Sequence, residues 1–152
     1  MSSVHLAQLN VATLRHSIDA PETAEFVKGL APVNEAGEAA PGFVWRLQSD
    51  AGDATSIQAF PNPLTIVNLT VWESQMALRD FAYRGLHRDF FRRRAEWFEP
   101  GSRAVMWWIE AGTLPTVDEA KARLEYFDRV GPSSHAFEFG QQFPEVATTL
   151  PF

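Results

Sequence analysis

Short apolar runs with the two-residue period of strands alternate along this chain with longer segments of helical character. Residues 4–11, 43–48, 64–72 and 104–110 are rich in apolar, aromatic and β-branched side chains, and they predict the strands of one sheet. A further short strand is predicted over residues 55–60. We expect the central strand at 64–72, because this run has the strongest β-forming composition.

Three segments between and after these runs predict helices. They cover residues 19–40, 73–98 with a break at Gly85, and 116–130, where Thr116 opens a Thr-x-x-Glu capping box. The order is therefore β-α-β-β-α-β with an additional C-terminal helix. This is the split βαβ pattern of a ferredoxin-like α+β fold with an antiparallel sheet.

The length and composition favour one domain over residues 1–152. A chain of 152 residues with 45% hydrophobic side chains can bury a core without metal or disulfides. Its twelve Phe and five Trp also supply enough aromatic surface to line a pocket. The tail, residues 131–152, is rich in Pro, Ser and Phe, and we expect it to add an edge strand at 136–139 or to wrap the surface as a lid.

Charge and cysteine content exclude several classes of function. A net charge of −6 disfavours nucleic acid or an anionic membrane as the main partner, because both attract basic surfaces. The absence of cysteine excludes disulfides, thiol catalysis and cysteine-based metal sites. Without a long apolar segment or a signal-like N-terminus, a cytoplasmic protein is expected. The spacing of histidines and carboxylates matches no metal motif, so no metal site is predicted.

The helix expected after Gly85 carries the most informative polar residues. At 100 degrees per residue, His87, Phe90, Phe91 and Trp97 fall within an apolar arc of roughly 140 degrees. Arg94 falls in the middle of that arc. Polar groups on an inward stripe either find partners inside the protein or face a cavity. In a cavity, His87 would act as acid or base, and Arg94 would anchor an anionic or enolate oxygen.

A structural role is the alternative for His87 and Arg94. In it, His87 is bonded to a backbone carbonyl and Arg94 is paired with a carboxylate such as Glu110. A separate question concerns the strand at 64–72, which places Asn68 and Trp72 on its more polar side. If that side faces the helix, Asn68 and Trp72 share a cavity with His87; if it faces a second subunit, they are interface residues.

Three segments resemble a known family. They are residues 87–98 (HRDFFRRRAEWF), 106–116 (MWWIEAGTLPT) and 131–137 (GPSSHAF), and they resemble domain-of-unknown-function family 3291. The resemblance implies a dimeric α+β barrel related in fold to antibiotic-biosynthesis monooxygenases, polyketide cyclases and haem-binding chlorite dismutase-like proteins. It implies no settled activity. A homodimer is expected from it, and also from the open sheet edges of this topology.

The sequence therefore favours a monooxygenase-like or cyclase-like enzyme that needs no cofactor and acts on an aromatic or polyketide-like metabolite, of the kind found in secondary metabolism. His87 and Arg94 are the expected catalytic residues. The expected substrate-binding residues are Asn68, Trp72, Phe90, Phe91, Trp97 and Trp108. The alternative is a non-catalytic protein that binds haem or another hydrophobic ligand through His87. A third hypothesis is a purely structural dimer.

Overall fold

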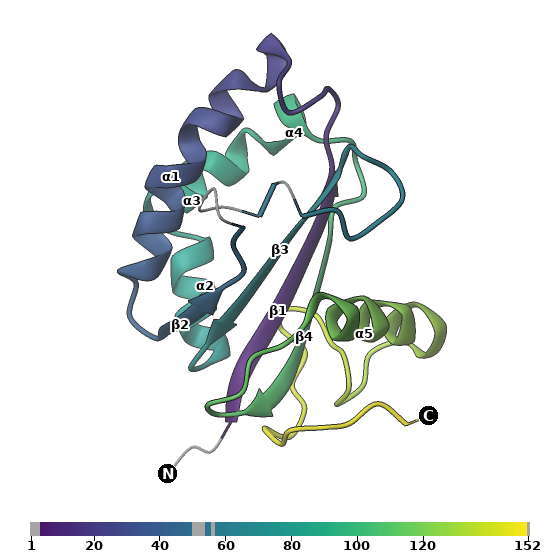
Figure 1. Ribbon diagram of the computed structural model, residues 1–152. Coiled ribbons are helices and arrows are strands. Elements are labelled where there is room, and N and C mark those ends of the chain that lie inside the picture. Colours follow the sequence, from purple (N-terminus) through teal and green to yellow (C-terminus); the bar gives the residue numbers. More distant parts are fainter. Residues whose placement is uncertain (1–3, 50–53, 56, 152) are drawn as a thin grey trace.

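The computed structural model describes residues 4–49, 54–55 and 57–151, and it builds them around a four-stranded antiparallel sheet (Figure 1). The strands are β1 (Val4–Thr13), β2 (Phe43–Arg46), β3 (Thr65–Trp72) and β4 (Arg103–Glu110), in the spatial order β2-β3-β1-β4. Two central strands, β1 and β3, pair along their length, and β4 pairs with the other edge of β1. This topology confirms the ferredoxin-like α+β fold.

Helices cover both faces of the sheet. They are a short 3-10 turn (Pro21–Thr23), α1 (Ala24–Glu38), α2 (Gln75–Ala82), α3 (Gly85–Arg92), α4 (Arg94–Trp97) and α5 (Val117–Val130). Figure 1 shows α1, α2, α3 and α4 on one side of the sheet and α5 on the other. Thr116 caps α5 as expected, since its Oγ1 accepts a hydrogen bond from the Glu119 amide at 3.1 Å.

Two expected elements differ from the structure. The single helix expected after Gly85 is interrupted at Arg93, whose φ of −90° and ψ of 5° end α3. The strand expected at 55–60 is wrong, because its described residues form a loop. Gln58 explains the loop, since its side-chain amide donates to the carbonyls of Phe60 at 2.9 Å and Asn62 at 3.0 Å and curls the chain back on itself.

The odd-numbered residues of the central strands form a continuous apolar core beneath α5. Its buried members are Ala7, Leu9, Val67, Leu69, Val71, Val105, Trp107, Ile109, Ala120, Leu124 and Ala136. Trp45, Leu47 and Phe60, from β2 and the loop after it, pack against this core. This face of the sheet is therefore covered within the single chain.

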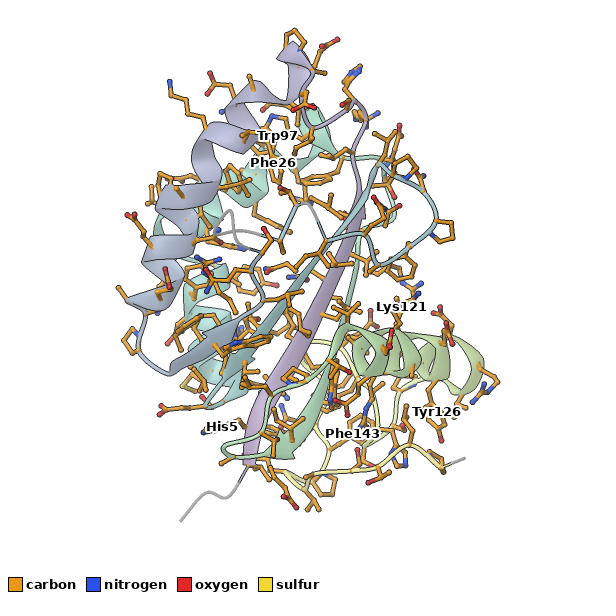
Figure 2. The ribbon with its side chains drawn as sticks, viewed as in Figure 1. His5, Phe26, Trp97, Lys121, Tyr126 and Phe143 are labelled. Carbon is orange, nitrogen blue, oxygen red and sulfur yellow. The ribbon has the colours of Figure 1, made fainter. Side chains whose placement is uncertain are left out.

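The C-terminal tail closes part of the outer edge of β4. Phe137 exchanges backbone hydrogen bonds of 2.8 and 2.9 Å with Met106, so the expected edge strand is reduced to one bridge. The rest of the tail wraps over the surface near α5, where Figure 2 shows Phe143 to the left of Tyr126. In the part of the chain with assigned structure, no helix has the length and apolar character needed to cross a bilayer.

Candidate functional site

Polar side chains interrupt the face of the sheet that α1–α4 cover. The register aligns Arg46 of β2 with Thr70 of β3 and Gln8 of β1, and it aligns Asn68 with Asn10 in the next row. Sheet faces covered by helices are normally apolar. Amides, a hydroxyl and a guanidinium in two rows at this position therefore indicate that the sheet and the helices enclose a cavity here and not a fully packed apolar core.

These two polar rows form the floor of the site, and hydrogen bonds hold most of their side chains in a fixed orientation. Trp72 Nε1 donates to Thr70 Oγ1 at 2.9 Å, and Thr70 Oγ1 donates to Gln8 Oε1 at 3.2 Å. Gln8 Nε2 donates to Asn10 Oδ1 at 3.1 Å, and Asn10 Nδ2 donates back to Gln8 Oε1 at 3.3 Å. The side chain of Asn68 takes no part in this chain of bonds and is exposed. Its amide is free to meet a ligand.

Two aromatic clusters form the walls. Phe26, Phe90, Trp97 and Phe98 make the first, with ring centroids 4.8–5.5 Å apart. The second runs through Phe43, Trp72, Phe81, His87 and Phe91, with successive centroids 4.9–6.4 Å apart. Figure 2 shows Phe26 and Trp97 together between α1 and α4. Because α3 contributes residues to both clusters, this helix is the roof of the site.

A cavity of about 470 Å³ lies between the polar floor and this roof. The volume is in the range of small-molecule sites. Its wall includes all but one of the expected site residues, namely His87, Arg94, Asn68, Trp72, Phe90, Phe91 and Trp97. Trp108 is the exception: it is buried with Leu6 and Phe137 in an apolar cluster and does not line the cavity.

His87 is poised as a neutral base. Its Nδ1 lies 2.8 Å from the carbonyl oxygen of Ala82, and because a carbonyl only accepts, Nδ1 carries the proton and Nε2 keeps a lone pair. Burial lowers the pKa of His87 below its ordinary 6.5, although the hydrogen bond to Ala82 acts in the opposite direction. The imidazole is therefore uncharged at neutral pH, with Nε2 able to accept a proton.

Arg94 lines the cavity, but its side chain is exposed and not buried on the inward stripe. The single helix assumed from the sequence is broken here, because α3 ends at Arg92 and α4 begins at Arg94. Its guanidinium lies 4.0 Å from the Phe91 ring centre, and Nη1 donates to the Phe91 carbonyl at 3.0 Å. The suggested partner, Glu110, is exposed and pairs in the sheet with Val4. The carbonyl bond expected for His87 in the structural alternative is present.

Gln8, Asn10 and Arg46 were not recognised as site residues from the sequence. The signal for the first two was present, because polar residues occupy alternate positions in the otherwise apolar run at 4–11. Arg46 follows the same rule in the run at 43–48. The described part of the chain brings no three His, Cys, Asp or Glu side chains together in a metal-binding group.

Gly29 allows the roof to sit close to α1. A Cβ atom at this position would lie 2.4 Å from Phe90 Cε1, which is inside the contact distance. Gly29→Ala should therefore force Phe90 and α3 outward. We expect a net loss of roughly 1 kcal/mol in the free energy of unfolding, since overpacking outweighs the gain in helix propensity. Urea denaturation measures this change.

Gly37→Ala is the matched control on the same helix. Its added Cβ would lie 3.3 Å from Phe81 Cζ, a contact that needs only a small shift. We expect its stability within about 0.5 kcal/mol of the wild type. Equal effects of the two substitutions would show that the close approach of Phe90 to α1 does not constrain the roof.

Solved structures of low sequence identity have a similar fold. A protein of unknown function from Nitrosomonas europaea has a TM-score of 0.53 at 13% identity, covering 75% of this chain and 97% of that one. A conserved protein from Methanosarcina mazei Go1 has a TM-score of 0.50 at 13% identity, with coverages of 68% and 91%. SnoaB, a cofactor-independent oxygenase from Streptomyces nogalater, has a TM-score of 0.49 at 18% identity, with coverages of 74% and 98%. At such identities the first two similarities bear on the fold alone.

Comparison at the level of sequence assigns the family. No curated protein matches the chain significantly. A family model described as Domain of unknown function (DUF3291) matches residues 5–150, almost the whole length. The chain therefore belongs to the DUF3291 family.

Proposed function

We propose that the cavity binds a small aromatic or polyketide-like molecule and that His87 removes a proton from it, as part of a monooxygenase-like or cyclase-like reaction without a cofactor. The observation that carries this proposal is the Nε2 lone pair of a neutral imidazole on the wall of an aromatic cavity. A general base is most useful when it is unprotonated at the working pH and lies beside the substrate. The lowered pKa of His87 and its place on the cavity wall support this role.

The polar floor is suited to the charge that such a proton transfer creates. The proton moves from an acidic C–H or O–H of the substrate to His87 Nε2, and the electron pair stays behind as an enolate or phenolate. Asn68 and Asn10 present uncharged amide donors on the floor of the same cavity. The amide of Asn10, which Gln8 already orients, can stabilise an oxyanion without reorganising. The enolate is the nucleophile needed either to close a ring or to add to dioxygen.

Deuterium exchange of 2-tetralone tests the proton transfer separately from any later step. This bicyclic ketone has acidic C–H bonds beside its carbonyl, and NMR in D₂O follows their exchange. We expect exchange that saturates with 2-tetralone and is competitively inhibited by 2-naphthol, which resembles the enol. Exchange no faster than with the same concentration of free imidazole would refute the proposal.

Haem binding is the second candidate, and it is favoured by the same Nε2 atom. A histidine whose Nδ1–H is held by a carbonyl is the usual arrangement for a metal ligand, so His87 could hold the iron. Bound haem would supply redox chemistry at the iron. A shift of the Soret band of haemin when the wild-type protein is added, and no shift when His87→Gln is added, would support haem binding. An unshifted band with the wild type would refute it.

The homodimer and the cytoplasmic location expected from the sequence remain predictions. Both faces of the sheet are covered within the chain, and β2 is an edge strand. A second copy that extends the sheet would therefore pair at β2.

A further inference from the structure

The wall of the cavity has a charge opposite to that of the protein. The whole chain has 19 acidic and 13 basic residues. Among the cavity-lining residues that the structure describes there is no Asp or Glu, whereas three are arginines, namely Arg46, Arg94 and Arg103. A cavity that concentrates positive charge in an acidic protein attracts anions.

The three arginines differ in how they are held. Arg103 donates two hydrogen bonds to the Asp128 carboxylate, so its charge is already paired. Arg94 is exposed at the mouth over Phe91. Arg46 projects from β2, and its side chain is only 12% exposed. Arg46 is therefore the arginine that places a charge deep in the wall.

Arg46 lies where a charged ligand group could be recognised. It is the partner of Thr70 in the sheet and continues the polar row toward Gln8. Its interactions include an ion pair with Glu38 at 3.7 Å, and the carboxylate of Glu38 is 46% exposed. A ligand anion in the cavity can join Glu38 as a further partner of the Arg46 guanidinium, which has several N–H donors.

We infer that the cavity selects a flat aromatic molecule bearing a carboxylate or ionised hydroxyl, with the anionic group at Arg46 and the ring system between the two aromatic clusters. This inference rests on the proposed function and narrows its substrate class. The guanidinium offers paired N–H donors that match a carboxylate, and charge-assisted hydrogen bonds of this type are stronger than neutral ones. Arg94, at the mouth, adds attraction during approach.

Two probes of the same shape test the charge preference. 2-Naphthoate and 2-naphthamide differ in charge but hardly in size, and calorimetry of the full chain gives both affinities. We expect 2-naphthoate to bind about tenfold more tightly in low salt. Equal affinities would overturn the inference and leave a hydrophobic site intact. Failure of both probes to bind would count against the cavity as a binding site, and so against the proposed function as well.

Substitutions then locate the preference. Arg46→Gln should bring the two affinities within about twofold by weakening 2-naphthoate alone, and Arg46→Lys, which keeps the charge, should retain part of the preference. Arg92→Gln on the exposed side of α3 is the matched control and should keep it in full. Circular dichroism verifies the fold of each variant. A tenfold preference that survives in Arg46→Gln would overturn the assignment to Arg46.

Discussion

Replacing His87 by glutamine is expected to lower the protein-catalysed exchange of 2-tetralone by about 10²- to 10⁴-fold. The glutamine amide can still donate to the Ala82 carbonyl, which in the wild type lies 2.8 Å from His87 Nδ1. It cannot accept a proton at neutral pH, so the base is removed with little change in packing. NMR exchange rates at saturating 2-tetralone measure the effect.

The pH dependence of the wild type gives this prediction a second measurement. Because burial lowers the pKa of His87, the neutral base persists at pH 6.5 and is lost only as the pH falls through the lowered value. The stability contributed by the neutral ring follows the same sign: it is complete above 6.5, the ordinary value, and declines as the pH falls from there through the folded-state pKa. We expect the exchange rate to show this acidic limb and His87→Gln to lack it.

His16→Gln is the control for a general effect of removing a histidine. His16 lies outside the cavity, and its side chain is 46% exposed near Glu22. Its loss should leave both the exchange rate and its pH profile unchanged. An exchange rate in His87→Gln equal to that of His16→Gln would show that another group in the cavity is the base, and the proposed role of His87 would be wrong.

The fold was predictable because local patterns specify it strongly. The alternation in residues 64–72 determines which side chains of β3 face the core, and the capping box at Thr116 marks the start of α5. The breaks were harder to foresee. Gly85 indicated the first break, but Arg93 is a residue type that gives no signal for the second. The contact of α3 with α1 joins segments far apart in the chain, so it is not visible in a local pattern. The loop at 57–60 was missed because its apolar side chains pack on the core without joining the sheet.

The walls of the site could be predicted more readily than its floor. His87, Phe90 and Phe91 lie within one turn, so their shared face follows from helix geometry alone. Arg94 lies beyond the break, where that geometry no longer applies. The row that joins Arg46 to Gln8 depends on strand order and register, which connect residues far apart in the chain. A single strand pattern cannot reveal such a row.

The second large effect is expected on stability, at Arg123. This residue of α5 is 1% exposed, and it holds the C-terminal tail in place. Its guanidinium donates to the His135 carbonyl at 3.1 Å, to the Thr148 hydroxyl at 2.7 Å and carbonyl at 2.6 Å, and to Glu119 at 3.1 Å. Burial lowers the pKa of Arg123 while the bond to Glu119 opposes this, as expected for a charge removed from water and compensated by hydrogen bonds.

Arg123→Met keeps an apolar side chain beside Trp107 and removes all of these donors. We expect the free energy of unfolding to fall by roughly 3 kcal/mol, because the tail carbonyls lose a charged partner and the segment around Thr148 separates from α5. Urea denaturation measures the loss. Limited proteolysis should then cut the tail before the sheet and α1, since only the tail depends directly on these bonds.

Arg129→Met on the same helix separates this effect from the loss of any arginine. Arg129 is exposed and lies 5.5 Å from the Tyr126 ring, so its removal should cost less than about 0.5 kcal/mol. Similar losses in the two variants would mean that water replaces the Arg123 donors without penalty. A large loss in Arg123→Met with an intact, protease-resistant tail would place its role in the core around Trp107, where the guanidinium lies 5.6 Å from the ring. In either case the tail would be held by its apolar contacts, chiefly those of the buried Phe137.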